Sequence, residues 1–178
     1  DGKTSNQLIK NADAAMYRSK DMGKNQYNLY KPKMNAKILE RLSFENGLYR
    51  AIENEEFNLV YQPQIRLDNH KLIGFEALVR WHSPEKGVLA PYKFIPIAEE
   101  TNLILPLGEW IIKKVCKQNK NWQNLGYKNL TCAVNISAKQ FSQKNIVQII
   151  KKALKESKLD PKYLELELTE SIIMDNVK

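Results

Sequence analysis

Hydrophobic residues along the chain repeat with two periods, and the change from one period to the other predicts its elements. Spacings of three and four residues predict helices at 4–22, 35–54, 91–100, 107–125 and 142–154. Short apolar runs predict strands at 26–30, 57–67, 72–81, 131–137 and 163–170. Turn residues at 68–70 predict that the two strands beside them form an antiparallel hairpin. From residue 107 the order helix, strand, helix, strand predicts parallel strands with crossover helices in an α/β fold.

The strand at 72–81, LIGFEALVRW, carries two charges within an apolar run. Alternation puts Glu76, Leu78 and Arg80 on one face, and the other face is apolar, with Phe75, Ala77, Val79 and Trp81. A buried charge is costly unless it is paired or binds a metal. Four strand residues span about 13 Å, which is too far for a close ion pair between Glu76 and Arg80. Either both side chains reach water at the strand ends, or they belong to a site.

Two further strands carry polar residues that a plain core strand does not need. Asn135 lies between Val134 and Ile136, and Glu170 ends an alternating strand. If parallel strands bring these residues and Glu76 to one edge, two carboxylates and an amide oxygen meet there. Hard divalent cations prefer such oxygen donors. The alternative is that Asn135 is a strand-end turn residue, and the neighbouring Glu165 and Glu167 are interpreted as surface charges.

Composition narrows the choice of function only slightly. The chain has 178 residues, of which 43% are hydrophobic, enough for one good core, and no apolar run is long enough to cross a membrane. The net charge is +8, but the lysines are spread along the chain without a nucleic-acid-binding motif. A solvated surface is therefore expected, with a patch for a polyanion as the alternative. Two cysteines outside any CxxC motif are expected to be reduced thiols in a cytoplasmic protein.

The N-terminal segment resembles the end of a known domain. Residues 11–30, NADAAMYRSKDMGKNQYNLY, resemble the last helix and strand of a GGDEF (diguanylate cyclase-type) domain. One helix and one strand cannot close a core of their own. We therefore expect residues 1–32 to end a GGDEF domain that begins upstream, and residues 33–54 to form a linker helix.

The remainder, residues 55–178, contains six ordered blocks that together form a recognisable pattern: YQP at 61–63, EALVRW at 76–81, FIPIAEET at 94–101, LGEW at 107–110, VNIS at 134–137 and ELTES at 167–171. With these blocks the segment resembles the N-terminal half of an EAL-type cyclic-di-GMP phosphodiesterase domain. The resemblance implies an incomplete TIM-like (β/α)8 barrel whose first strand runs antiparallel to the others. It also implies hydrolysis of cyclic-di-GMP to linear pGpG.

The same resemblance assigns roles to single residues. It implies that Glu76, Asn135 and Glu170 are ligands of Mg²⁺ or Mn²⁺, and that Gln62 and Arg80 hold the dinucleotide. A guanidinium on the face of Glu76 is then explained, because it can pair a substrate phosphate while the carboxylate binds metal.

Further groups of the family's site would follow Lys178, so these 178 residues by themselves are expected not to hydrolyse cyclic-di-GMP. We expect a homodimer, because half a barrel exposes sheet edges. A non-catalytic cyclic-di-GMP receptor and a dimerising signalling module are the alternative functions.

Overall fold

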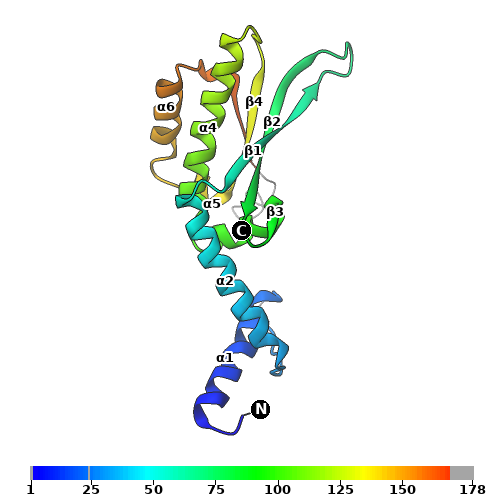
Figure 1. Ribbon diagram of the computed structural model, residues 1–178, viewed down its shortest axis with the longest axis vertical. Helices are drawn as coiled ribbons and strands as arrows, with labels where there is room; N and C mark the ends of the chain where they lie inside the picture. Colours follow the sequence, from blue (N-terminus) through cyan, green and yellow to red (C-terminus); the bar gives the residue numbers. More distant parts are fainter. Residues whose placement is uncertain (1, 24, 169–178) are drawn as a thin grey trace. The chain divides into compact units, whose positions relative to one another are not determined.

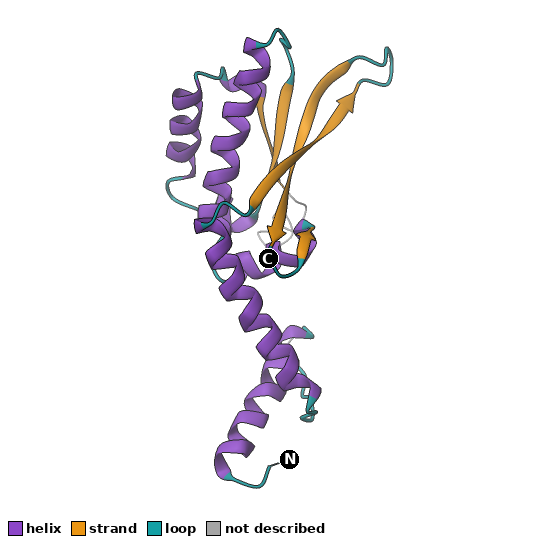
Figure 2. Cartoon of the chain, in the orientation of Figure 1, coloured by secondary structure: helices purple, strands orange, loops and turns teal. Residues whose placement is uncertain are grey.

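The computed structural model describes residues 2–23 and 25–168, and the chain divides into two compact units, residues 1–47 and 48–178. Figure 1 follows the chain from its N-terminus, and Figure 2 shows its helices and strands. Within the described ranges, no helix is both long and apolar enough to cross a membrane. The boundary at residues 47 and 48 falls inside helix α2 (Lys33–Glu53). The predicted boundaries at residues 32 and 54 stay predictions.

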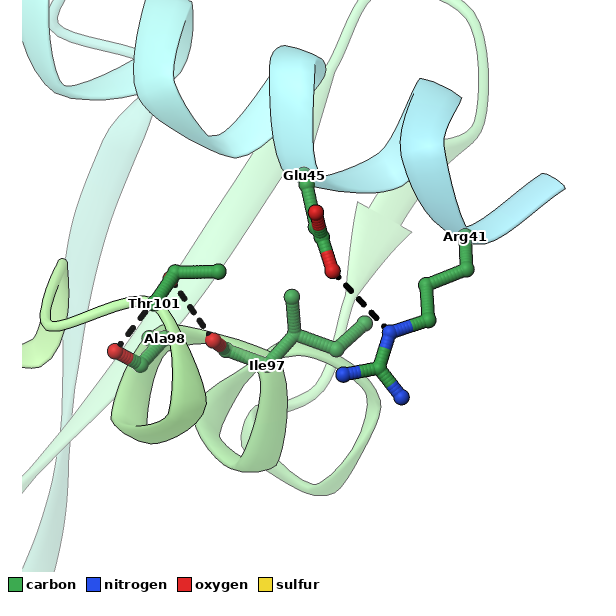
Figure 3. Close-up of polar contacts among 5 residues, drawn as sticks. All are labelled: Arg41, Glu45, Ile97, Ala98 and Thr101. Carbon is green, nitrogen blue, oxygen red and sulfur yellow. Dashed lines mark hydrogen bonds and ion pairs between the residues drawn. The ribbon is translucent and has the colours of Figure 1, made fainter. Parts of the chain in front are cut away.

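The first unit is built on helix α1 (Ser5–Asp21) and the first turns of α2. The side chain of Thr4 caps α1 by accepting a hydrogen bond from the backbone N–H of Gln7 at 3.3 Å. A small buried cluster holds the unit together and consists of Ala14, Ala15 and Met34, with Tyr30 packed against it. Further along α2, the half-buried side chains of Arg41 and Glu45 form an ion pair at 3.0 Å (Figure 3).

The prediction of a strand at residues 26–30 is wrong, because this segment is irregular in the structure. A strand needs a neighbour with which its backbone groups can pair. Within residues 2–23 and 25–168, no strand pairs with this segment. Side chains hold it instead: Asn28 donates to the Ser19 hydroxyl at 3.1 Å, and Asn35 donates to the Tyr30 hydroxyl at 2.8 Å.

The second unit contains a mixed sheet whose strand order is β1-β2-β4-β5. Its strands are β1 (Phe57–Ile65), β2 (Leu72–Ser83), β3 (Gly87–Leu89), β4 (Thr131–Ile136) and β5 (Leu164–Leu168). The predicted hairpin is confirmed, since β1 and β2 pair antiparallel, and the predicted parallel strands are confirmed in the β2–β4 and β4–β5 pairs. Strand β3, which the hydrophobic pattern did not predict, pairs antiparallel with the end of β2.

Helices connect the strands of the second unit and cover one face of its sheet (Figure 1). They are α3 (Pro91–Glu100), α4 (Ile104–Asn124), α5 (Ala138–Phe141), α6 (Ile146–Ser157) and the short 3-10 helix η1 (Pro161–Tyr163). At the end of α3 the Thr101 hydroxyl is 2.7 Å from the carbonyl oxygen of Ile97 and 3.4 Å from that of Ala98 (Figure 3). The helix predicted from residue 142 begins only at Ile146, because Ser142 ends α5.

The core of the second unit lies between the sheet and these helices. Its largest fully buried side chains come from both layers and include Trp81, Phe94, Leu107, Ile112, Val115, Val134 and Ile136. The rings of Phe57, Trp81 and Phe94 meet with centroid distances of 5.6–6.0 Å.

Asn119 of α4 is 1% exposed and joins this layer to the starts of two strands. Its side-chain amide donates to the carbonyl oxygens of Leu130 at 3.2 Å and Tyr163 at 3.0 Å.

Candidate functional site

The polar side chains of the sheet share the face opposite to the packed core. In the hairpin Gln62 lies opposite Glu76, and in the parallel pair of β4 and β5 Asn135 lies beside Glu167. Because Glu76 is in register with Ala133, two residues before Asn135, all four polar residues project from one face. Glu76, Leu78 and Arg80 are half-buried while Ala77, Val79 and Trp81 are buried, so the predicted division of this strand is confirmed.

Glu76 and Asn135 touch. The side-chain amide of Asn135 donates a hydrogen bond to Oε1 of Glu76 at 2.7 Å, across 59 residues of sequence. Asn135 is exposed and Glu76 is half-buried, so the pair is open to solvent. The structure therefore brings together two of the three residues expected to bind metal, and Glu76 is in the middle of its strand rather than at an end.

Glu167 is a third oxygen donor on this face, and sequence reasoning missed it. Partial burial raises the pKa of its carboxyl group, and the negative charges of Glu76 and then Glu165 raise it further. The carboxylate of Glu167 therefore lies close enough to that of Glu76 for the two negative charges to repel each other. A usable signal was present, because Glu167 lies in the block ELTES that carries the resemblance and alternation puts it two residues after Glu165 on one face of the strand.

The third predicted ligand, Glu170, lies outside the described residues. Among the residues that the structure describes, no three His, Cys, Asp or Glu side chains gather closely enough to hold a metal ion. The described donors are two carboxylates, from Glu76 and Glu167, and the amide oxygen of Asn135. Such a set fits a hard divalent cation better than a soft one.

The two residues expected to hold a dinucleotide flank this cluster on its own face. Gln62 is exposed and lies opposite Glu76 on the neighbouring strand. Arg80 is half-buried, and its guanidinium donates to the backbone carbonyl of Val79 at 2.9 Å. Within the described part of the chain, Arg80 forms no ion pair, which leaves most of its N–H donors open to an anion.

The loop after Asn135 is fixed by a capping box. The backbone N–H of Ser137 donates to Oε1 of Gln140 at 3.0 Å, and the backbone N–H of Gln140 donates to the Ser137 hydroxyl at 3.3 Å. Gln140 is 4% exposed and lies against Gly108 of α4. A Cβ atom at Gly108 would lie 1.7 Å from Nε2 of Gln140, so only glycine leaves room for this arrangement.

A cavity of about 320 Å³ opens beside Asn135, where β2 and β4 separate beyond Ala77 and Val134. Its lining is mostly apolar and includes Leu78, Tyr92, Ile95, Pro96 and Ile136, with polar groups from Glu99, Ser137 and Gln140. Small-molecule sites in proteins combine apolar walls with a few polar groups in this way.

The two cysteines take no part in the chemistry of this face. Both are free and buried, and burial raises the pKa of Cys116 to about 11 and that of Cys132 to about 12. Their thiols are therefore protonated near neutral pH and are poor nucleophiles.

Comparison with known proteins identifies the family. The second unit contains a mixed sheet that begins with an antiparallel hairpin, and one face of this sheet carries the contact between Glu76 and Asn135. Residues 45–178 match the model of the EAL domain. The chain belongs to the EAL domain family.

Its relatives include named enzymes. The chain is 41% identical over 174 residues to the bifunctional diguanylate cyclase/cyclic di-GMP phosphodiesterase MucR of Pseudomonas aeruginosa, covering 98% of this chain and 25% of that protein. It is 40% identical over 175 residues to the cyclic di-GMP phosphodiesterase PdeR of Escherichia coli, covering 98% of this chain and 26% of that protein. The chain thus spans about a quarter of the length of these relatives.

A solved structure also resembles the chain. The complex of the MucR phosphodiesterase of P. aeruginosa with cyclic-di-GMP matches with a TM-score of 0.73 and 38% identity, over 75% of this chain and 54% of that one.

Proposed function

We propose that this chain supplies part of the active site of a cyclic-di-GMP phosphodiesterase, which hydrolyses cyclic-di-GMP to pGpG. The observation that carries the proposal is the contact of 2.7 Å between Asn135 and Glu76, because it joins two distant motifs on the open face of the sheet. The names of MucR and PdeR, and the MucR complex with cyclic-di-GMP, support the choice of substrate.

The proposed cofactor is Mg²⁺ or Mn²⁺, held by Glu76 and Asn135 together with Glu170 as the resemblance implies. The position of Glu167 beside Asn135 adds Glu167 to the candidate ligands. When bound, the cation would polarise the phosphoryl oxygen and lower the pKa of the attacking water.

Gln62 and Arg80 then orient the dinucleotide. The guanidinium of Arg80 is suited to a phosphate because it offers paired N–H donors, and Gln62 can donate from the opposite strand. The apolar cavity beside Asn135 offers space for a planar base.

A calorimetric titration with cyclic-di-GMP, with and without Mn²⁺, tests this function on the purified protein. The test variant is Glu76→Gln, and Glu85→Gln in the exposed turn before β3 is the matched control. Wild type and control should bind in a metal-dependent manner, while Glu76→Gln should lose at least tenfold in affinity, since loss of a charged ligand weakens a hard-cation site. Equal binding by all three proteins would refute the assignment.

Product analysis separates the enzyme from the receptor. Formation of pGpG identifies a phosphodiesterase, whereas metal-dependent binding without any product identifies a receptor. The expectation that the 178 residues alone do not hydrolyse cyclic-di-GMP stays a prediction, and formation of pGpG by this chain would contradict it.

We propose further that residues 1–32 are the end of a GGDEF domain. The match to bifunctional MucR supports this, because it covers 98% of the chain, whereas the EAL match begins only at residue 45.

A homodimer in the cytoplasm is proposed as well. Strand β1 is an edge of the sheet, and exposed Val60, Ile65 and Leu67 on and beside it support pairing with a second copy. Light scattering during size-exclusion chromatography should give twice the 20.7 kDa of the chain.

A further inference from the structure

The positive charge of the chain is concentrated in one part of the second unit. Residues 109–162 contain twelve lysines and three acidic residues, so this stretch carries a net charge of +9. The whole chain carries +8, and the remainder is therefore close to neutral. The stretch contains no arginine. Lysines that look scattered along the sequence thus belong largely to one layer of the fold.

Most of these lysines lie on the outer side of two neighbouring helices. Helices α4 and α6 pack against each other on the same face of the sheet (Figure 1). Their buried residues, such as Ile112 and Val115 on α4 and Ile149 and Ala153 on α6, define the inner side of each helix. Helical spacing puts seven lysines on the opposite side, and an eighth, Lys158, is exposed directly after α6. We name this set the lysine face: Lys113, Lys114, Lys117, Lys120, Lys151, Lys152, Lys155 and Lys158.

Few acidic groups neutralise the lysine face. Lys113 forms an ion pair with Glu109 at 2.7 Å, and the pKa of Lys113 is raised by that hydrogen bond and by the charges of Glu109 and Glu156. Elsewhere in the described ranges, no acidic side chain pairs with Lys117, Lys151 or Lys155. Clustered like charges repel each other, so this layer gains from an anionic partner.

We infer that the lysine face docks on an anionic phospholipid surface. Lysine presents a compact charge on a flexible stem, which suits a diffuse layer of headgroups, whereas reading of nucleic acid relies largely on the planar fork of arginine. A face made of two adjacent helices also offers no single element to enter a groove. Val147, which lies one helical turn before Lys151 on α6, is 53% exposed, and an apolar side chain of this kind partitions into the headgroup region.

The strength of such docking can be stated per lysine. Each basic residue close to an anionic bilayer contributes about a fivefold gain in partitioning at physiological salt. Three lysines therefore account for about a hundredfold. This inference is independent of the proposed phosphodiesterase activity, because its residues lie on the helical side of the sheet and not on the face of Glu76 and Asn135.

Vesicle co-sedimentation tests the inference on the purified protein. Vesicles contain either phosphatidylcholine alone or phosphatidylcholine with about a third phosphatidylserine, a mixture that carries the negative potential of an anionic leaflet. The test variant replaces Lys151, Lys152 and Lys155 by glutamine. The control variant replaces Lys10, Lys20 and Lys31, which are exposed in the first unit, and changes the net charge equally. Glutamine preserves helix propensity, and thermal melting verifies that both variants fold.

The expected result is binding to the anionic vesicles alone, a loss of about a hundredfold in the test variant, and a change of less than about threefold in the control. Half-molar salt should release the wild type, since it screens the attraction. Equal losses in both variants would show that net charge alone matters and would overturn the inference. So would an absence of vesicle binding, or tighter binding of a single-stranded DNA oligonucleotide than of the vesicles.

Discussion

Replacement of Gly108 by alanine tests how the chain holds Asn135 in place. An added Cβ would lie 1.7 Å from Nε2 and 2.9 Å from Cδ of Gln140, distances at which atoms overlap. Gln140 is 4% exposed, so its side chain cannot simply turn into solvent. The side chain of Gln140 must therefore leave its position. The hydrogen bond of 3.0 Å that it accepts from the backbone N–H of Ser137 is then lost.

The cost of this change can be worked out from three contributions. Loss of the hydrogen bond from the Ser137 backbone N–H costs about 1 kcal/mol, and crowding of a packed site costs about 1–3 kcal/mol. Alanine in place of glycine inside a helix returns about 1 kcal/mol, because it lowers the entropy of the unfolded chain. The net loss in the free energy of unfolding is therefore about 1–3 kcal/mol.

Urea unfolding followed by tryptophan fluorescence measures this loss, since Trp81, Trp110 and Trp122 all lie in the second unit. The decisive control is the same substitution made in a Gln140→Ala background. There the clash has no partner, so Gly108→Ala should be stabilising by about 1 kcal/mol instead of destabilising. The reasoning is refuted if Gly108→Ala costs the same in both backgrounds.

Three more outcomes are expected. Glu167→Gln should weaken Mn²⁺ binding by about as much as loss of a first ligand does, whereas Glu165→Gln should change it little; equal effects would contradict a role for Glu167. A thiol reagent should modify Cys116 and Cys132 only on unfolding, because both are buried with raised pKa values, and rapid labelling of the folded protein would be incompatible with that burial. Asn119→Ala should lower the free energy of unfolding by about 2–3 kcal/mol, measured by urea unfolding, because it removes the hydrogen bonds to the carbonyls of Leu130 and Tyr163, which directly precede β4 and β5. A loss below about 0.5 kcal/mol would rule out that function of the side chain.

Local patterns in the sequence predicted the parts of the fold that local forces determine. The placement of Glu76 and Arg80 on one face follows from alternation along a strand, and the hairpin follows from the turn at 68–70. The irregular segment at 26–30 shows the limit of this reasoning. Its residues suit a strand, but a strand forms only where a partner provides hydrogen bonds, and no pattern within the segment reports on a partner.

The sequence predicted only those residues of the candidate site that belong to recognisable motifs. Asn135 stood out because it is polar within an apolar strand, but its contact with Glu76 depends on how two strands align across 59 residues. Glu167 was overlooked because a glutamate in the alternating run LELEL is typical of a solvent-exposed face. The packing of Gly108 against Gln140 joins two motifs through space, and no spacing along the chain indicates it.

The position of Asn119 has a consequence for the alignment of the strands. Its amide group holds the residues directly before β4 and directly before β5 at a fixed offset from each other. A slip of β5 by one residue would turn Glu167 to the opposite face and present Leu168 or Leu166 beside Asn135 instead. A buried helix residue at one end of the sheet therefore selects which side chain stands beside Asn135 at the other end.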